Sequence, residues 1–161
     1  MRGFRFVVAI LLALSLSGLA SPALAKAKME VAAVEVNGKL ELDKERDRHV
    51  RTTIRRLASH SAKHLDFGKH GKVEVTLIVK ELTIEQGPDV LRITCTLVGK
   101  LAGGGSARSR ISFGGKPDKK KQLEKQVLSS VTDGVMTRLA ELARAKEKLA
   151  DKKKEKEKES G

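Results

Sequence analysis

Four histidines are the first residues in the sequence whose spacing could support chemistry. His60 and His64 are four positions apart in a segment with helical periodicity, so their imidazoles would lie on one side of a helix. His70, in the loop that follows, could supply a third ligand to a metal ion. However, Lys63 lies beside the pair and would repel a cation, and no H-E-x-x-H motif is present. We therefore interpret these side chains as solvated histidines, and we predict no metal and no other cofactor.

The single cysteine, Cys95, falls on the inward phase of an alternating apolar segment, residues 91–97. A buried cysteine acts as a small hydrophobic residue, and one cysteine cannot form an internal disulfide. No serine lies in a G-x-S-x-G context, and the glycine runs at 103–105 and 114–115 lack the spacing of a phosphate-binding loop. No catalytic constellation emerges, so we expect a protein that is not an enzyme.

Basic residues exceed acidic residues along the whole chain. The 161 residues include 33 Lys or Arg and 20 Asp or Glu, which gives a formal net charge of +13. With no Trp, no Tyr and four Phe, the chain lacks the aromatic faces on which bases or sugars stack. We place the candidate binding surface, for a protein partner or an anion, on the outer face of the predicted sheet, at Lys80, Arg92, Arg108 and Arg110. A second basic concentration lies on the outward side of the first predicted helix, at Arg48, Arg51, Arg55, Arg56 and Lys63.

The first 25 residues have the pattern of an export signal. Arg2 and Arg5 precede an apolar run, residues 6–16, and Ala23-Leu24-Ala25 is typical of a cleavage site. The apolar run is shorter than the roughly 20 residues that span a membrane. We predict a cleaved signal peptide at 1–25 and one domain at 26–144. Residues 145–161 then form a Lys/Glu-rich tail, either a helical extension or disordered.

The hydrophobic periodicity changes several times between residues 29 and 144. Alternation predicts strands, and apolar residues at steps of three or four predict helices. The strand at 73–84 changes its apolar phase near Glu81, which indicates a β-bulge or a twist. The predicted elements are strands at 29–36, 73–84, 91–97 and 107–113, and helices at 43–67 and from 118 onward.

The element order is therefore β-α-β-β-β-α, which favours an α+β fold. We expect a two-layer sandwich in which a four-stranded, mostly antiparallel sheet carries both helices on one face. Short turns would join the last three strands in a meander, and the first strand would enter the sheet through a helical crossover. The expected core is Val31, Val50, Ile54, Leu57, Val75, Leu77, Ile93, Cys95, Leu97, Ile111, Phe113, Val127, Val131 and Val135.

The order of elements resembles that of small accessory modules of the cell envelope, built as a sheet with two helices. The resemblance concerns the element order alone and implies no function. The export signal indicates a periplasmic or secreted bacterial protein with no transmembrane span after cleavage. Our leading hypothesis is a non-enzymatic binding or accessory module whose partner is an envelope protein, and intracellular nucleic acid is not an expected partner. The alternative is a cationic protein that binds an anionic envelope polymer electrostatically.

Overall fold

The computed structural model describes residues 27–37, 40, 42–69 and 71–159. The predicted signal peptide lies outside these described residues, so its cleavage stays a prediction. The elements are β1 (Lys28–Val36), α1 (Lys44–Ala62), β2 (Lys72–Gln86), β3 (Leu91–Leu101), β4 (Ser106–Gly115), the short 3-10 helix η1 (Pro117–Lys119) and α2 (Lys120–Glu159).

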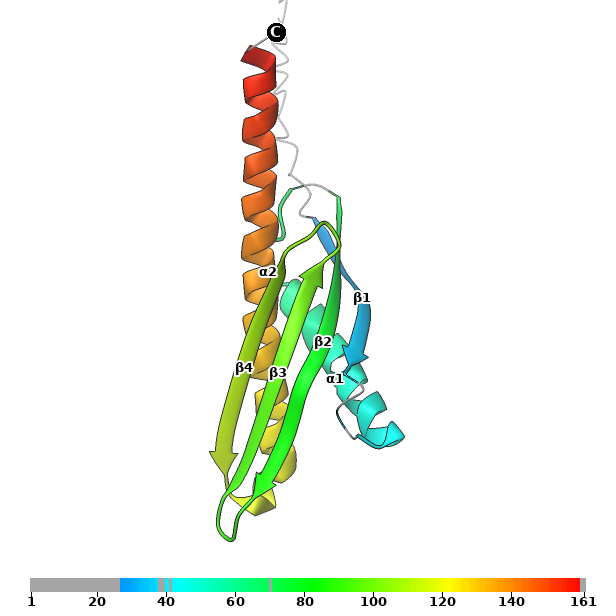
Figure 1. Cartoon of the computed structure of the whole chain (residues 1–161), viewed down its shortest axis with the longest axis vertical. Coiled ribbons are helices and arrows are strands. Elements are labelled where there is room, and N and C mark those ends of the chain that lie inside the picture. Colours follow the sequence, from blue (N-terminus) through cyan, green and yellow to red (C-terminus); the bar gives the residue numbers. More distant parts are fainter. Residues whose placement is uncertain (1–26, 38–39, 41, 70, 160–161) are drawn as a thin grey trace, which may run out of the picture.

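The four strands form one sheet in the order β1-β2-β3-β4. β1 runs parallel to β2, whereas β2, β3 and β4 form an antiparallel meander. Figure 1 shows both helices behind the sheet, with α1 near β1 and α2 crossing behind β3 and β4. The predicted α+β architecture, its element order and the placement of the helices on one face are confirmed.

The core lies between the inner face of the sheet and the two helices. α1 contributes Val50, Ile54 and Ala58, and α2 contributes an apolar stripe from Leu123 to Leu139. Most of the predicted core residues are buried, and Val31, Leu57 and Ile111 are partly buried against that core. Phe113 was assigned to the core wrongly, since 36% of its surface is exposed. It faces inward near the end of an edge strand, where it lines an open hollow beside Leu123 of α2.

The predicted irregularity in the second strand is a β-bulge at Lys80. The pairing register with β3 shifts between Val79 and Glu81, and Lys80 has no partner in the ladder. Residues before the bulge turn odd-numbered side chains inward, and residues after it turn even-numbered ones inward, as Leu82 shows. The bulge therefore lets one long strand keep its apolar side chains on the same face.

The first helix is shorter than its periodicity predicts. Asp43 caps it by accepting a hydrogen bond from the Arg46 N–H at 2.7 Å, but the helix ends at Ala62 rather than near Phe67. The N–H groups of Lys63 and His64 bond three residues back instead of four, which tightens the last turn. Phe67 is buried in the loop that follows. Apolar residues after Ala62 therefore continue the apolar periodicity of the sequence although the helix has already ended.

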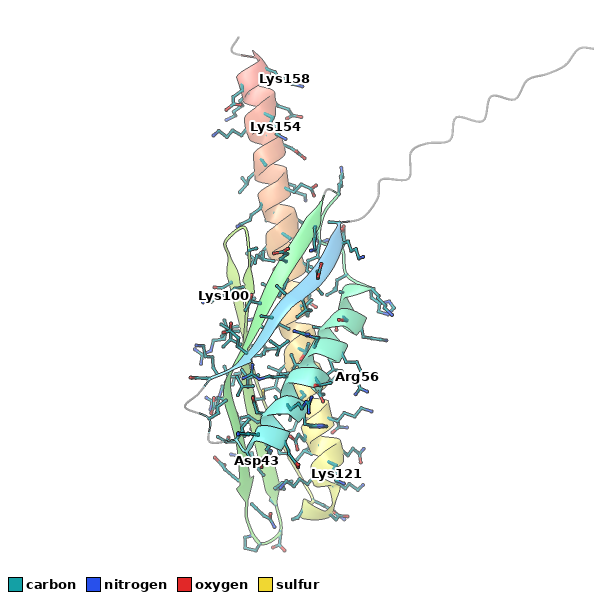
Figure 2. All side chains as sticks on the ribbon, turned by 90° about the vertical axis from the view of Figure 1, so that its right-hand side faces the viewer. Asp43, Arg56, Lys100, Lys121, Lys154 and Lys158 are labelled. Carbon is teal, nitrogen blue, oxygen red and sulfur yellow. The ribbon has the colours of Figure 1, made fainter. Side chains whose placement is uncertain are left out.

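The second helix is long enough to outreach the sheet. Its 40 residues span about 60 Å, and its last turns project past the strands, where Figure 2 labels Lys154 and Lys158. Before the projection, Lys146 Nζ donates to the carbonyl oxygens of Gly103 and Gly104, and Glu147 accepts from the Lys69 N–H at 3.0 Å. One turn of α2 thus holds both the β3–β4 turn and the loop before β2. Neither helix of the described residues meets the length and apolarity that a membrane crossing requires.

Candidate functional site

The outer face of the sheet carries no helix in the described part of the chain, and its charges are separated by strand. Seen along the sheet in Figure 2, Lys100 points away from the helices. β3 and β4 contain no acidic residue, and their charged side chains are Arg92, Lys100, Arg108 and Arg110. The alternation and the pairing register place the carboxylates of the neighbouring strands on the same face, at Glu30, Glu35, Glu74, Glu81 and Glu85.

The four predicted surface residues do not form one cluster. Arg108 and Arg110 are neighbours on β4, paired with Val98 and Thr96 of β3. Arg92 lies opposite Glu85, and its position on β3 is four residues from that of Thr96, or about 13 Å along the strand. Lys80 is the exposed residue of the β-bulge, one strand farther away. The structure brings together only the two arginines of β4.

A hydrogen-bonded network fixes Arg110 midway along β4 on this face. The Glu81 carboxylate accepts from the Thr96 hydroxyl at 2.8 Å and from Arg110 Nη2 at 3.0 Å. Thr96 is fully buried although it faces outward, because these two side chains cover it. The Arg110 side chain remains 63% exposed, so its guanidinium is held by Glu81 and is still accessible to a ligand.

Lys100 is a member of this surface that the sequence analysis missed. It lies on β3 two residues beyond Val98, the partner of Arg108, and it is exposed on the same face. The predicted strand ended at Leu97. If the alternation had been followed to Leu101, the prediction would have included Lys100. We define the basic face as Lys100, Arg108 and Arg110.

Of the histidines considered as metal ligands, the structure describes His60 and His64. The rings of His60 and His64 are 5.3 Å apart, but His64 lies beyond the end of α1, and His70 is outside the described residues. Among the described residues, no three His, Cys, Asp or Glu side chains converge on a common point. Cys95 is fully buried, and burial raises the pKa of its thiol to about 12.

A hollow of about 520 Å³ lies between the C-terminal half of α2 and the ends of β2 and β3. Its apolar floor includes Phe67 and Leu101, and its rim carries charges of both signs. Several of the rim charges are engaged within the protein: Lys72 binds Glu30 at 2.5 Å and Glu74 at 3.4 Å, and its hydrogen bond lowers the pKa of Glu30. Lys146 and Glu147 hold loops, as described above. The rim therefore selects no particular ligand charge.

No protein-family model matches the sequence, and the search of curated proteins found no match. Several solved structures are similar in outline. A minor lipoprotein of Acinetobacter baumannii is 13% identical, covering 73% of this chain and 92% of that one with a TM-score of 0.40. A lipoprotein of Caulobacter crescentus is 9% identical, covering 68% and 86% with a TM-score of 0.40. The PelC dodecamer of Paraburkholderia phytofirmans is 15% identical, covering 74% and 91% with a TM-score of 0.42. Likeness at these TM-scores assigns no activity, location or partner to this chain.

Proposed function

We propose that this chain is an exported, non-enzymatic binding module of the bacterial cell envelope that presents the basic face to a partner protein. One observation carries the proposal. β3 and β4 hold only cationic charges on a sheet face that neither helix covers. Of these, Arg110 is oriented by Glu81, whereas Arg108 and Lys100 have no carboxylate within salt-bridge distance in the described part of the chain. A fixed cation, Arg110, with two unpaired cations in line beside it favours a specific acidic partner.

Capture from envelope extract tests the proposal. The bait is residues 26–161, and the triple variant Lys100→Gln, Arg108→Gln, Arg110→Gln is compared with the triple Arg48→Gln, Arg55→Gln, Arg56→Gln. The control removes the same charge from exposed positions on α1. We expect wild type and control to retain one stoichiometric protein through a high-salt wash, and the basic-face variant to lose it while its thermal unfolding is unchanged. Equal loss in both variants would contradict the assignment of the basic face.

The same experiment judges the electrostatic alternative, which the net charge of +13 favours. Binding to an anionic polymer depends on the number of cations more than on their position, and it weakens steeply with salt. Both triple variants would then lose mixed anionic material to the same degree, and the high-salt wash would remove it from all three baits. That outcome would replace the partner-protein proposal.

A further inference from the structure

β4 is an edge strand, and its main-chain groups are divided between its two sides. The Leu101 N–H donates to the Gly105 oxygen at 3.0 Å, which fixes the hydrogen-bonded pairs of the β3–β4 ladder. In an antiparallel ladder such pairs alternate with pairs whose N–H and C=O groups point away from the partner. The odd-numbered residues of β4 from 107 to 113 therefore bond to β3. The even-numbered ones, Arg108, Arg110 and Ser112, point their main-chain groups at the free edge.

Two side-chain contacts support this assignment independently. The Ser112 and Thr94 hydroxyls are 2.8 Å apart, and side chains approach this closely in pairs without ladder hydrogen bonds. Arg138 Nη1 of α2 donates to the Arg108 carbonyl oxygen at 2.6 Å. A side chain of α2 can reach this oxygen because the oxygen points toward the free edge and not toward β3.

The open part of the edge runs from Arg110 to Gly114. Arg138 occupies the Arg108 carbonyl, but the main-chain groups of Arg110 and Ser112 have no hydrogen bond within the described residues. The opposite edge of the sheet is closed differently. There, Arg51 Nη1 donates to the Val34 carbonyl oxygen at 3.1 Å, and α1 packs along β1. An unpaired edge is a template for another strand, so β4 is the strand able to accept one.

Two separate hollows lie on the inner side of this strand, one toward each of its ends. They lie between β4 and α2, with volumes of about 580 Å³ near Arg108 and about 470 Å³ near Phe113. The second hollow is bounded by Leu123 and by the exposed part of the Phe113 ring. A strand added to β4 would therefore place inward side chains beside the Phe113 ring and Leu123, with Gln126, Ser129 and Ser130 of α2 completing the lining.

The other side chains of an added strand would stand beside the basic face, because successive side chains alternate between the two faces of a sheet. Acidic residues at those positions would lie next to Arg108 and Arg110. A second copy of the chain does not fit as well. Pairing two β4 strands would bring these arginines against each other, and the β1 edge of a second copy is covered by α1 and Arg51.

We propose that the β4 edge accepts, by strand addition, an extended segment of a partner protein that alternates acidic and apolar residues. The inference rests on the proposed function and names the chemistry of its partner. Main-chain bonds to Arg110 and Ser112 would give affinity, and the hollow at Phe113 and the basic face would give specificity.

The test uses a fluorescein-labelled ten-residue peptide of alternating Glu and Val, with Lys replacing Glu in the control peptide. Ser112→Pro removes an outward N–H without touching the β3 ladder, and Ser112→Ala is matched because both variants lose the hydroxyl bond to Thr94. We expect Ser112→Pro to bind the acidic peptide about fivefold or more weakly than Ser112→Ala, since at least one main-chain bond is lost. In wild type, the peptide should slow hydrogen exchange at the Arg110 and Ser112 amides.

Three results would overturn the inference: equal affinity of the two Ser112 variants, equal binding of the Lys peptide, or exchange protection confined to α1. Self-association that Ser112→Pro abolishes would assign the edge to a second copy instead. Capture from envelope extract separates this inference from the proposed function. If Ser112→Pro retains the envelope partner and the basic-face triple variant loses it, strand addition is wrong and the binding-module proposal stands.

Discussion

At the scale of single residues, Glu81 has the most connected position on the outer face. Its two oxygens bind different strands, one through Thr96 of β3 and the other through Arg110 of β4. A carboxylate that follows a β-bulge thus organises the arginine on which the proposed recognition depends. Because the network crosses three strands, its geometry is set by the sheet and not by local sequence.

Cys95 carries the prediction that belongs to this scale. Burial raises the pKa of its thiol from 9.0 to about 12, so the folded state holds the proton more tightly than the unfolded state. This contribution to stability is complete below pH 9 and is lost as pH rises from about 9 toward 12. Between pH 9 and pH 11, we expect wild type to lose about 2 to 3 kcal/mol more unfolding free energy than Cys95→Ala.

Urea unfolding at several pH values measures the difference, and Cys95→Ala cancels the titration of all other groups. A thiol reagent at pH 8 provides a second readout, and it should modify Cys95 only after the protein unfolds. Rapid modification of the folded protein would show that the thiol is accessible, contrary to its burial.

At the scale of elements, α2 packs against β3 at Gly99, a residue without a side chain. A Cβ on Gly99 would lie 2.6 Å from both Leu139 Cδ1 and Val135 Cγ1. The absence of a side chain on β3 therefore sets how closely the long helix packs on the sheet. Gly134 has a similar role on the helix, where its closest neighbour is the Ser109 hydroxyl at 3.0 Å from an added Cβ.

We expect Gly99→Ala to lower the unfolding free energy by about 1 to 3 kcal/mol, because the added methyl group overpacks the contact with α2. Gly103→Ala is the matched control, since nothing lies within 4 Å of its added Cβ. Chemical denaturation of the two variants gives the comparison. Equal stabilities would mean that α2 can shift without cost, which the packing at Val135 and Leu139 opposes.

The elements also show what the sequence alone could predict. Alternating and helical periodicities identified the four strands, both helices and the irregularity at Lys80, because burial on one face imposes those periods. The periodicities predicted α1 to be too long, because apolar residues in the following loop continue its apolar stripe. They also assigned Phe113 to the core, because periodicity does not reveal which strand is at an edge of the sheet. Periodicity also does not predict which residues pair across strands. The structure was therefore needed to show that Arg92 is separate from Arg110 and that Lys100 belongs to the basic face.

At the scale of the whole molecule, the fold consists of two parts of unequal burial. β3 is buried along most of its length between β2, β4 and α2, whereas β1 has Val34 as its buried residue and α1 buries Val50, Thr53, Ile54 and Ala58. β1 is also joined to β2 through α1, while each strand of the meander is joined to the next by a short turn.

Native-state hydrogen exchange should resolve these two parts. We expect β1 and α1 to open together with a free energy about 2 kcal/mol or more below that of β3 and the buried turns of α2, because fewer apolar contacts oppose the opening. The β3 amides should exchange only through global unfolding. A single opening free energy for all strands would show that the sheet is one cooperative unit.

The two arginines that each bind one main-chain carbonyl at a sheet edge have a consequence for the order of events during folding. Arg51 lies close to β1 in sequence, but Arg138 follows Arg108 by thirty residues and reaches it only after α2 has docked. A chain with its meander formed and its last helix undocked would therefore expose the full length of β4. In that interval the chain is more vulnerable to strand-to-strand aggregation than the folded protein, so refolding yield should fall as concentration rises.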